Sequence, residues 1–175
     1  MLKRIVLALL IAIVLLVGYA TSKPDDFRVE RNTRMAAPPE KVFALINDLK
    51  GFNTWNPWEK KDPGKGQYGA GATVGPGASY AWDSDKLGSG RMTIESSAPS
   101  SKVTMRLDFI KPMQATNAAV FALAPDGDGT RVSWSMSGKN TLGSKLFQVF
   151  VSMDKMVGDD FDAGLANLKA LAEAK

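Results

Sequence analysis

The chain has 175 residues, of which 45% are hydrophobic and 23% charged, and its formal net charge is +4. These values are typical of one globular domain with a sizeable core, and they argue against intrinsic disorder. Histidine and cysteine are both absent, which excludes Ser-His-Asp and Cys-His catalysis, disulfides, Fe–S clusters and zinc or haem held by those residues. We therefore predict no cofactor and no metal site.

The basic residues do not form a cluster. Lys3 and Arg4 lie at the extreme N-terminus, and without residues 1–20 the chain has 20 basic and 18 acidic residues, which leaves a net charge of +2. A nucleic-acid-binding domain would concentrate its basic side chains on one face. We therefore predict no nucleic-acid partner.

The N-terminal segment, residues 1–20 (MLKRIVLALLIAIVLLVGYA), has an uninterrupted apolar run from Ile5 to Val17. This run is intermediate in length between the core of a signal peptide and a membrane-spanning helix. Gly18 and Ala20 resemble a signal-peptidase site, whereas Tyr19 suits the membrane interface. The first prediction is an uncleaved transmembrane anchor that contacts the membrane through residues 5–20. The alternatives are a cleaved signal peptide, which would release a secreted protein, and a buried soluble helix.

In both membrane cases Lys3 and Arg4 stay on the inner side, so the rest of the chain is exported to the periplasmic or extracellular side. Residues 21–26 (TSKPDD) form a short polar linker. An anchored domain, residues 27–175, would then lie close to the bilayer.

The exported part begins with an alternating strand from Phe27 to Met35, followed by a helix that starts at about Pro39 and ends near Gly51. The stretch NTWNPWEK (residues 53–60) comes next. Because Pro57 lacks a backbone donor and restricts the residue before it, this stretch is predicted to be a bent, non-helical hinge that carries Trp55 and Trp58.

Residues 60–77 are predicted to be a loop with a weak strand near Val74. From residue 78 onward apolar residues recur with a period of two, which predicts strands around residues 80–82, 92–94, 103–109, 117–124 and 132–136. The short turns between them indicate an antiparallel meander. An apolar stripe at helical spacing then predicts one long helix from about Thr141 to Ala174, the only element large enough to cover the sheet.

This order of elements resembles the START-like (SRPBCC) superfamily with its helix-grip fold, and within it the polyketide cyclase/dehydrase and lipid-transport family. The stretches that carry the resemblance are AAPPEKVFALINDL (36–49), TWNPWEK with Asp62-Pro63, GASYAW (77–82), GSGRMTI (88–94), VSWSMSG (132–138) and DKMVGDDFDAGLANLK (154–169). The resemblance implies an α+β fold, in which a curved antiparallel sheet wraps around a long C-terminal helix. It also implies a cavity between the two for an apolar ligand, but no fixed catalytic set.

Inward-facing apolar residues are the candidates for ligand binding, although each could equally fill a core. Met adapts to irregular apolar pockets, and the polar ends of Tyr and Trp can orient a ligand. The candidates are Trp55, Trp58, Tyr80, Trp82, Met92, Met105, Phe109, Trp134, Met136, Phe150, Met153 and Val157.

Three functions are compatible with this pattern. The first is a membrane-anchored domain that binds a hydrophobic small molecule, such as a lipid or an isoprenoid-like compound. The second is a cyclase or dehydratase acting on a hydrophobic substrate, with Asp83, Glu59, Tyr80 or an Arg as acid or base. The third is an interaction module, in which Trp55 and Trp58 contact a partner or the bilayer.

Overall fold

The computed structural model describes residues 1–174 and contains a seven-stranded antiparallel sheet with the order β1-β7-β6-β5-β4-β3-β2. The strands are β1 (Asp26–Met35), β2 (Gly66–Tyr68), β3 (Ser79–Ser84), β4 (Gly88–Ala98), β5 (Lys102–Lys111), β6 (Ala115–Asp126) and β7 (Gly129–Lys139). Successive strands from β2 to β7 are neighbours, and only β1 pairs with a strand distant in sequence. The predicted meander and helix-grip fold are therefore confirmed.

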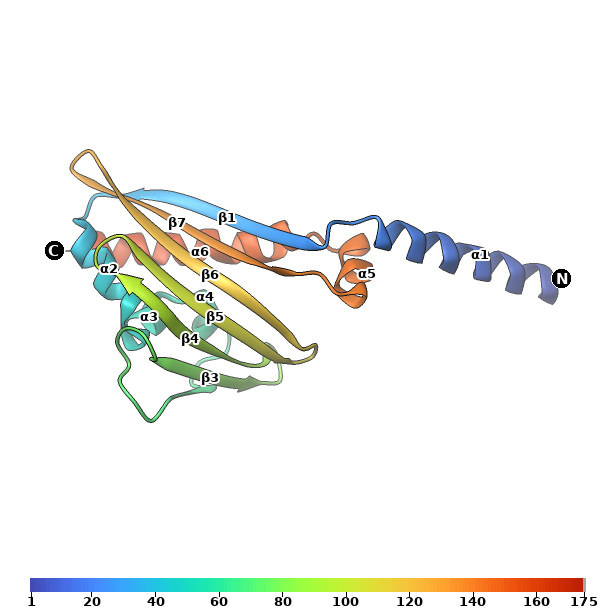
Figure 1. Ribbon diagram of the computed structural model, residues 1–175, viewed down its shortest axis with the longest axis horizontal. Coiled ribbons are helices and arrows are strands. Elements are labelled where there is room, and N and C mark those ends of the chain that lie inside the picture. The colour runs from blue at the N-terminus through green and yellow to red at the C-terminus, as the bar shows by residue number, and fades with distance from the viewer. Residues whose placement is uncertain (175) are drawn as a thin grey trace.

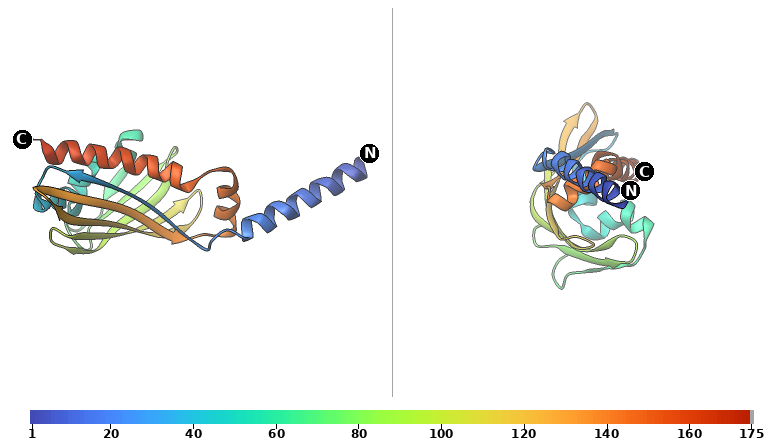
Figure 2. Two further views of the ribbon diagram at one scale, coloured as in Figure 1. Left: turned by 90° about the horizontal axis from the view of Figure 1, so that it is seen from above. Right: turned by 90° about the vertical axis from the view of Figure 1, so that its right-hand side faces the viewer.

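Six helices accompany the sheet within residues 1–174, and Figure 1 shows their arrangement. They are α1 (Leu2–Thr21), α2 (Pro39–Asn47), α3 (Leu49–Trp55), α4 (Pro57–Lys61), α5 (Leu142–Phe150) and α6 (Met153–Glu173). Helix α6 lies along the sheet and packs mainly on β1. Helices α2 and α3 lie toward the end of the domain farthest from α1, α4 packs beside α6, and α5 lies near the start of β1 (Figures 1 and 2).

The alternation read from the sequence corresponds to the two faces of the sheet. On β1 the odd-numbered residues from Phe27 to Met35 are buried or half-buried, and the even-numbered ones are exposed. Inward residues of β4 to β7 continue this apolar face, and they include Ile94, Met105 and Val132. Burial of one face of each strand fixes the register, because a shift of one residue would expose this entire apolar set.

The prediction of one continuous helix from Thr141 to Ala174 is wrong in one respect. The helix is interrupted at Val151 and Ser152, which separate α5 from α6. Both residues have extended backbone conformations. Ser152 caps α6 by accepting a hydrogen bond from the backbone N–H of Lys155 at 3.2 Å. The apolar stripe continues across this break, so periodicity alone did not reveal it.

The stretch NTWNPWEK is also more regular than predicted. Trp55 ends α3 and Pro57 begins α4, so the non-helical part is reduced to Asn56. The side chain of Asn56 accepts a hydrogen bond from the backbone N–H of Trp58 at 3.0 Å and caps α4. Proline is favourable at the first position of a helix, which is why two short helices form there.

Two smaller predictions also need correction. The helix that begins at Pro39 ends at Asn47, and Gly51 lies inside α3. The predicted loop between residues 60 and 77 contains the short edge strand β2, whereas Val74 forms only an isolated bridge with Asp48.

Helix α1 projects away from the domain (Figure 1) and, within residues 1–174, is the helix that is long and apolar enough to cross a membrane. Most of its side chains are exposed, but Leu16 and Val17 are half-buried and Ala20 is fully buried. This last part of α1 lies at α5, which α1 contacts. The linker that follows is hydrogen-bonded to the domain, because Asn140 donates its backbone N–H to Asp25 O at 2.7 Å and its side-chain amide to Pro24 O at 3.0 Å.

Gly164 allows α6 to approach the sheet closely. A Cβ atom at this position would lie 2.7 Å from Cζ3 of Trp134 and 3.1 Å from Cδ of Pro57. We expect Gly164→Ala to lower the thermal midpoint of the full chain in detergent, because overpacking costs about 1–3 kcal/mol and exceeds the gain of about 1 kcal/mol in helix propensity.

The matched control is Gly51→Ala in α3, where the nearest atom to an added Cβ lies 3.4 Å away. This variant should melt at or above the temperature of the unmodified chain. Equal effects of the two substitutions would contradict the close approach at Gly164.

Candidate functional site

The interface between the sheet and α6 has two ends that differ in packing. The end nearest α2 and α3 is filled by large aromatic side chains, whereas several inward residues toward α5 remain partly exposed. We call the first the closed end and the second the open end.

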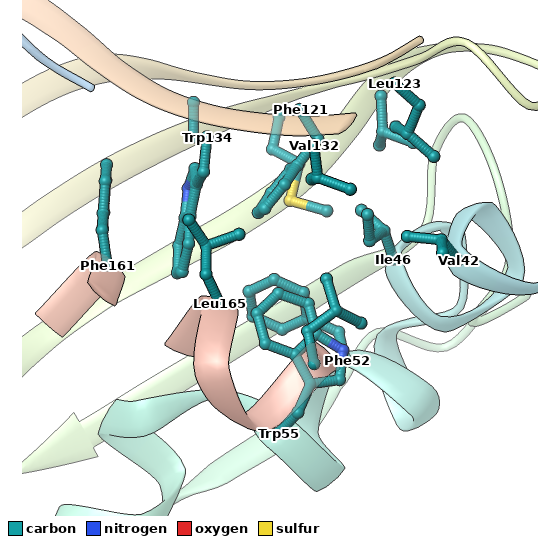
Figure 3. Close-up of a cluster of buried hydrophobic side chains, with 14 of the residues drawn as sticks. Val42, Ile46, Phe52, Trp55, Phe121, Leu123, Val132, Trp134, Phe161 and Leu165 are labelled. Carbon is teal, nitrogen blue, oxygen red and sulfur yellow. The ribbon is translucent and has the colours of Figure 1, made fainter. Parts of the chain in front are cut away.

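Four buried rings, from Trp55, Phe121, Trp134 and Phe161, form what we call the aromatic wall at the closed end (Figure 3). Trp134 stacks on Phe161 with 4.0 Å between ring centroids, and on Phe121 with 4.8 Å. Trp55 meets Trp134 edge to face at 5.7 Å and donates its Nε1–H to the backbone O of Leu45 at 3.0 Å. Each ring is held by at least one neighbour, so the wall is a fixed, packed structure.

A single cross-strand row of inward residues crosses the open end. It consists of Phe27, Gly138, Asn117, Leu107 and Met92, each opposite the next in the strand register. Phe27 and Leu107 are half-buried, although both are large and apolar. Next to this row, Trp82 meets Phe109 at 5.8 Å between ring centroids, and both rings are also half-buried. The open end thus presents partly uncovered apolar surface on the inner face of the sheet.

Two buried polar groups accompany this apolar surface. The amide of Asn117 lies over Gly138, where a Cβ would overlap it, and its Nδ2 meets the weak acceptor Sδ of Met136 at 3.9 Å. Within residues 1–174, Nε1 of Trp134 has no hydrogen-bond acceptor. An unpaired buried donor costs about 1–3 kcal/mol, but the Trp134 ring belongs to the packed aromatic wall, so Asn117 is the polar group of this pair that lies at the open end.

Arg31 fastens the edge strand β1 to α6. Its Nη1 and Nη2 donate to the two carboxylate oxygens of Asp154 at 2.9 and 3.0 Å, and its Nε donates to Asp162 at 3.1 Å. The guanidinium lies over Gly158, where any Cβ would overlap it. Hydrogen bonding and charge from Arg31 lower the pKa of Asp154, and the pKa of Arg31 is raised in return. We call this arrangement the Arg31 clasp.

The candidate acids and bases do not converge on the open end. Tyr80 donates its hydroxyl to Oε2 of Glu59 at 2.7 Å, and Oε1 of Glu59 accepts the backbone N–H of Gly64 at 2.7 Å. Burial and the hydrogen bond to Glu59 raise the pKa of Tyr80, so its phenol stays protonated. Asp83 is exposed, with Lys111 Nζ 4.0 Å from its carboxylate. The Glu59–Tyr80 pair therefore ties α4 to β3.

The predicted binding residues fall into three groups. Trp55, Met105 and Trp134 are almost fully buried in the core, and Tyr80, Met92, Met136 and Val157 are buried to a slightly smaller extent. Half-buried positions belong to Trp58, Trp82, Phe109 and Met153. Phe150 is 75% exposed on α5 and does not line the sheet–helix interface as expected. A binding role for the remaining residues stays a prediction.

Sequence reasoning identified Leu107 as an inward-facing residue but missed Phe27 and Asn117 as site candidates, and it did not recognise the Arg31 clasp. Asn117 is an isolated polar residue at an inward position of an alternating strand, which is a detectable signal. The clasp is marked by Asp154, Gly158 and Asp162, which are spaced four residues apart on one face of α6.

A hollow of about 670 Å³ lies against the outer face of the sheet, outside the sheet–helix interface. Its exposed side chains include Arg28, Glu95 and Arg106, which point away from α6. Arg28 pairs with Glu30 and Arg106 with Asp108, so the charges there are already neutralised.

Comparison with known proteins gives a consistent result for the domain. The profile of the family described as polyketide cyclase/dehydrase and lipid transport matches residues 26–173. The sequence matches no curated protein.

Solved structures with the same fold include the Aha1 dimer from Colwellia psychrerythraea, which has 16% identity and a TM-score of 0.60, with 84% of this chain and 96% of that chain covered. A protein from Chromobacterium violaceum has 18% identity and a TM-score of 0.61, with 87% and 100% covered. The di-domain ARO/CYC StfQ from the steffimycin biosynthetic pathway has 10% identity and a TM-score of 0.60, with 85% and 51% covered. These similarities concern the fold.

The Arg31 clasp should make stability depend on pH. Because the pKa of Asp154 is lowered in the folded state, its contribution is present above its unfolded pKa of about 3.9 and is lost as the pH falls through the folded value. We expect Arg31→Gln to lower the thermal midpoint at pH 7, and we expect its difference from the unmodified chain to shrink below about pH 5.

Circular dichroism melts of the full chain in one detergent, over a series of pH values, measure this difference. Arg91→Gln, at an exposed position on β4, is the control and should change the midpoint little at any pH. A difference for Arg31→Gln that is constant from pH 7 to pH 3 would show that the ion pair does not stabilise the fold.

Proposed function

The chain belongs to the polyketide cyclase/dehydrase and lipid transport family, and on this premise we propose that it is a membrane-anchored, exported domain that binds a hydrophobic small molecule. The ligand would be a lipid or an isoprenoid-like compound. It would bind at the open end of the sheet–helix interface, against the half-buried side chains of Phe27, Leu107 and Phe109.

The observation that supports this proposal most directly is the partly exposed apolar surface on the inner face of the sheet. Leu107 and Phe109 alternate with polar residues on β5, as they would on a buried face, yet both keep contact with solvent. Covering apolar surface is favourable by about 25 cal/mol per Å², so an apolar ligand would gain affinity there. Asn117, which lies in the open-end row, supplies a polar group that would orient an oxygen of such a ligand.

Membrane attachment through α1 rests on its length and composition. Twenty residues of helix span about 30 Å, which equals the hydrocarbon thickness of a typical bilayer. Lys3 and Arg4 precede the apolar run, and the positive-inside rule then orients the domain outward.

A labelling experiment tests the exported orientation. Since the chain lacks cysteine, Lys50→Cys creates one thiol at an exposed position of the domain, and Leu2→Cys creates one at the other end of α1. A membrane-impermeant maleimide added to intact spheroplasts should label the thiol at position 50 without lysis, and the thiol at position 2 only after lysis. The reverse pattern, or a mature mass beginning at Thr21, would contradict the anchored, exported state.

Ligand binding is tested by photocrosslinking. The full chain in nanodiscs that contain a diazirine-bearing fatty acid should form adducts on peptides of β5 and β6, and Leu107→Trp should reduce them several-fold by filling the open end. Val74→Trp is the control, because Val74 is exposed on a loop and pairs with Asp48. Adducts confined to α1 and α5 would mean that the domain meets lipid but binds none at the open end.

A further inference from the structure

The orientation of α5 is reversed with respect to an ordinary surface helix. Its polar side faces the protein, where Lys145 is buried and its Nζ lies 2.6 Å from Oδ1 of Asp25. On the same side Gln148 donates its side-chain amide to Oδ1 of Asn140 at 2.6 Å. A helix on a soluble protein normally turns its apolar stripe to the core. Here Lys145 and Gln148 make the internal polar contacts and Leu146 and Val149 are half-buried, whereas the rest of the apolar stripe is left outward.

The outward side of α5 is strongly apolar. Leu142 and Phe147 are exposed, and Phe150 is 75% exposed. At 100° per residue these three, with Leu146 and Gly143, form one continuous arc of the helix. This arc has no charged residue, and Lys145, the one charged residue of α5, lies on the opposite side of the helix.

The apolar surface continues from α5 onto the neighbouring hairpin between β5 and β6. Ile110 and Met113 are exposed there, and Sδ of Met113 lies 3.8 Å from the position that a Cβ of Gly143 would take. Met156, in the first turn of α6 and therefore close to α5 along the chain, is also exposed. We call Ile110, Met113, Leu142, Phe147 and Phe150 the α5 face.

The contact between α1 and α5 determines what can cover this face. Helix α5 meets α1, whose covered residues are Leu16, Val17 and Ala20 in its last turns. If α1 spans a bilayer, these turns lie at the membrane interface, where Tyr19 and Lys23 also lie, with the Lys23 ammonium 5.0 Å from the Tyr19 ring. Helix α5 must then lie at the same depth. Figure 2 shows α5 across the end of the domain, roughly perpendicular to α6.

We propose that the α5 face is seated in the outer interface of the bilayer that holds α1, as an amphipathic helix lying in the membrane plane. This inference rests on the proposed anchoring role of α1. It adds a second membrane contact and fixes the direction of the domain. The open end, which adjoins the β5–β6 hairpin through Phe109, then faces the lipid, so an apolar ligand can pass between bilayer and domain without crossing water.

Site-directed fluorescence in nanodiscs tests the seating of the α5 face. Phe150→Cys and Val74→Cys each place one thiol at an exposed apolar position of the full, otherwise cysteine-free chain. With an NBD label, position 150 should emit at shorter wavelength and be quenched at least twofold more by doxyl-labelled phospholipid than position 74. A label at position 150 that remains as accessible to water as the one at position 74 would overturn the proposal. A blue-shifted label that doxyl lipid does not quench would indicate a protein partner and would also overturn it.

A second variant shows whether the apolar arc is responsible. The double substitution Phe147→Gln and Phe150→Gln should abolish the doxyl quenching of a label at Met113→Cys, whereas Val74→Gln should leave it unchanged. Quenching that persists in the double variant would overturn the role of the arc.

Photocrosslinking distinguishes the seating of the α5 face from ligand binding at the open end. Quenching at position 150 without adducts on β5 would retain the seating and reject ligand binding, and adducts on β5 with a water-exposed label would do the opposite.

Discussion

The stack of Trp134 on Phe161 joins the sheet to its only long covering helix within residues 1–174, and the rest of the domain is arranged around it. The two rings lie almost parallel, at 10°, with 4.0 Å between their centroids. Such a close approach requires a helix surface without a side chain next to the ring, and Gly164 provides it. Pro57 and Trp58 pack on the same group, so α4, β7 and α6 meet there.

The open end follows from the dimensions of these elements. Seven strands about 4.8 Å apart make a sheet roughly 30 Å wide, whereas a helix with its side chains is about 10 Å across. Helix α6 therefore covers mainly the β1 side, α2 covers β5 to β7 at the closed end, and α4 contacts β3 through the Glu59–Tyr80 hydrogen bond. Within the described residues 1–174, the inner face of β3 and β5 toward α5 has no cover of comparable size. This is where Trp82, Leu107 and Phe109 stay half-buried.

The strands could be predicted from the sequence because each buries one face, and the alternation of β5 or β7 reports this directly. The break between α5 and α6 could not, because Phe150 and Met153 keep the spacing of a helix face although Phe150 lies outside the core. Spacing shows that residues share a side, but it does not show which side faces the protein. The same limit applies to the binding residues. Strand alternation identifies the inward positions, but the tertiary packing of the aromatic rings decides which of these positions are filled and which stay partly exposed.

The place where α1 joins the domain is a consequence of strand pairing. The first strand β1 pairs antiparallel with the last strand β7, and Asp26 lies opposite Lys139. The chain that precedes β1 and the chain that follows β7 must therefore lie at the same end of the sheet, so α1 and α5 become neighbours. Because α6 starts after α5 and runs back along the sheet, its first turn lies at this end too, and the β5–β6 hairpin reaches the same end through the meander. The pairing and order of the strands thus bring α1, α5 and the open end to the same end of the domain. Hydrogen bonds from Asn140 and Lys145 to the linker that follows α1 stabilise this arrangement.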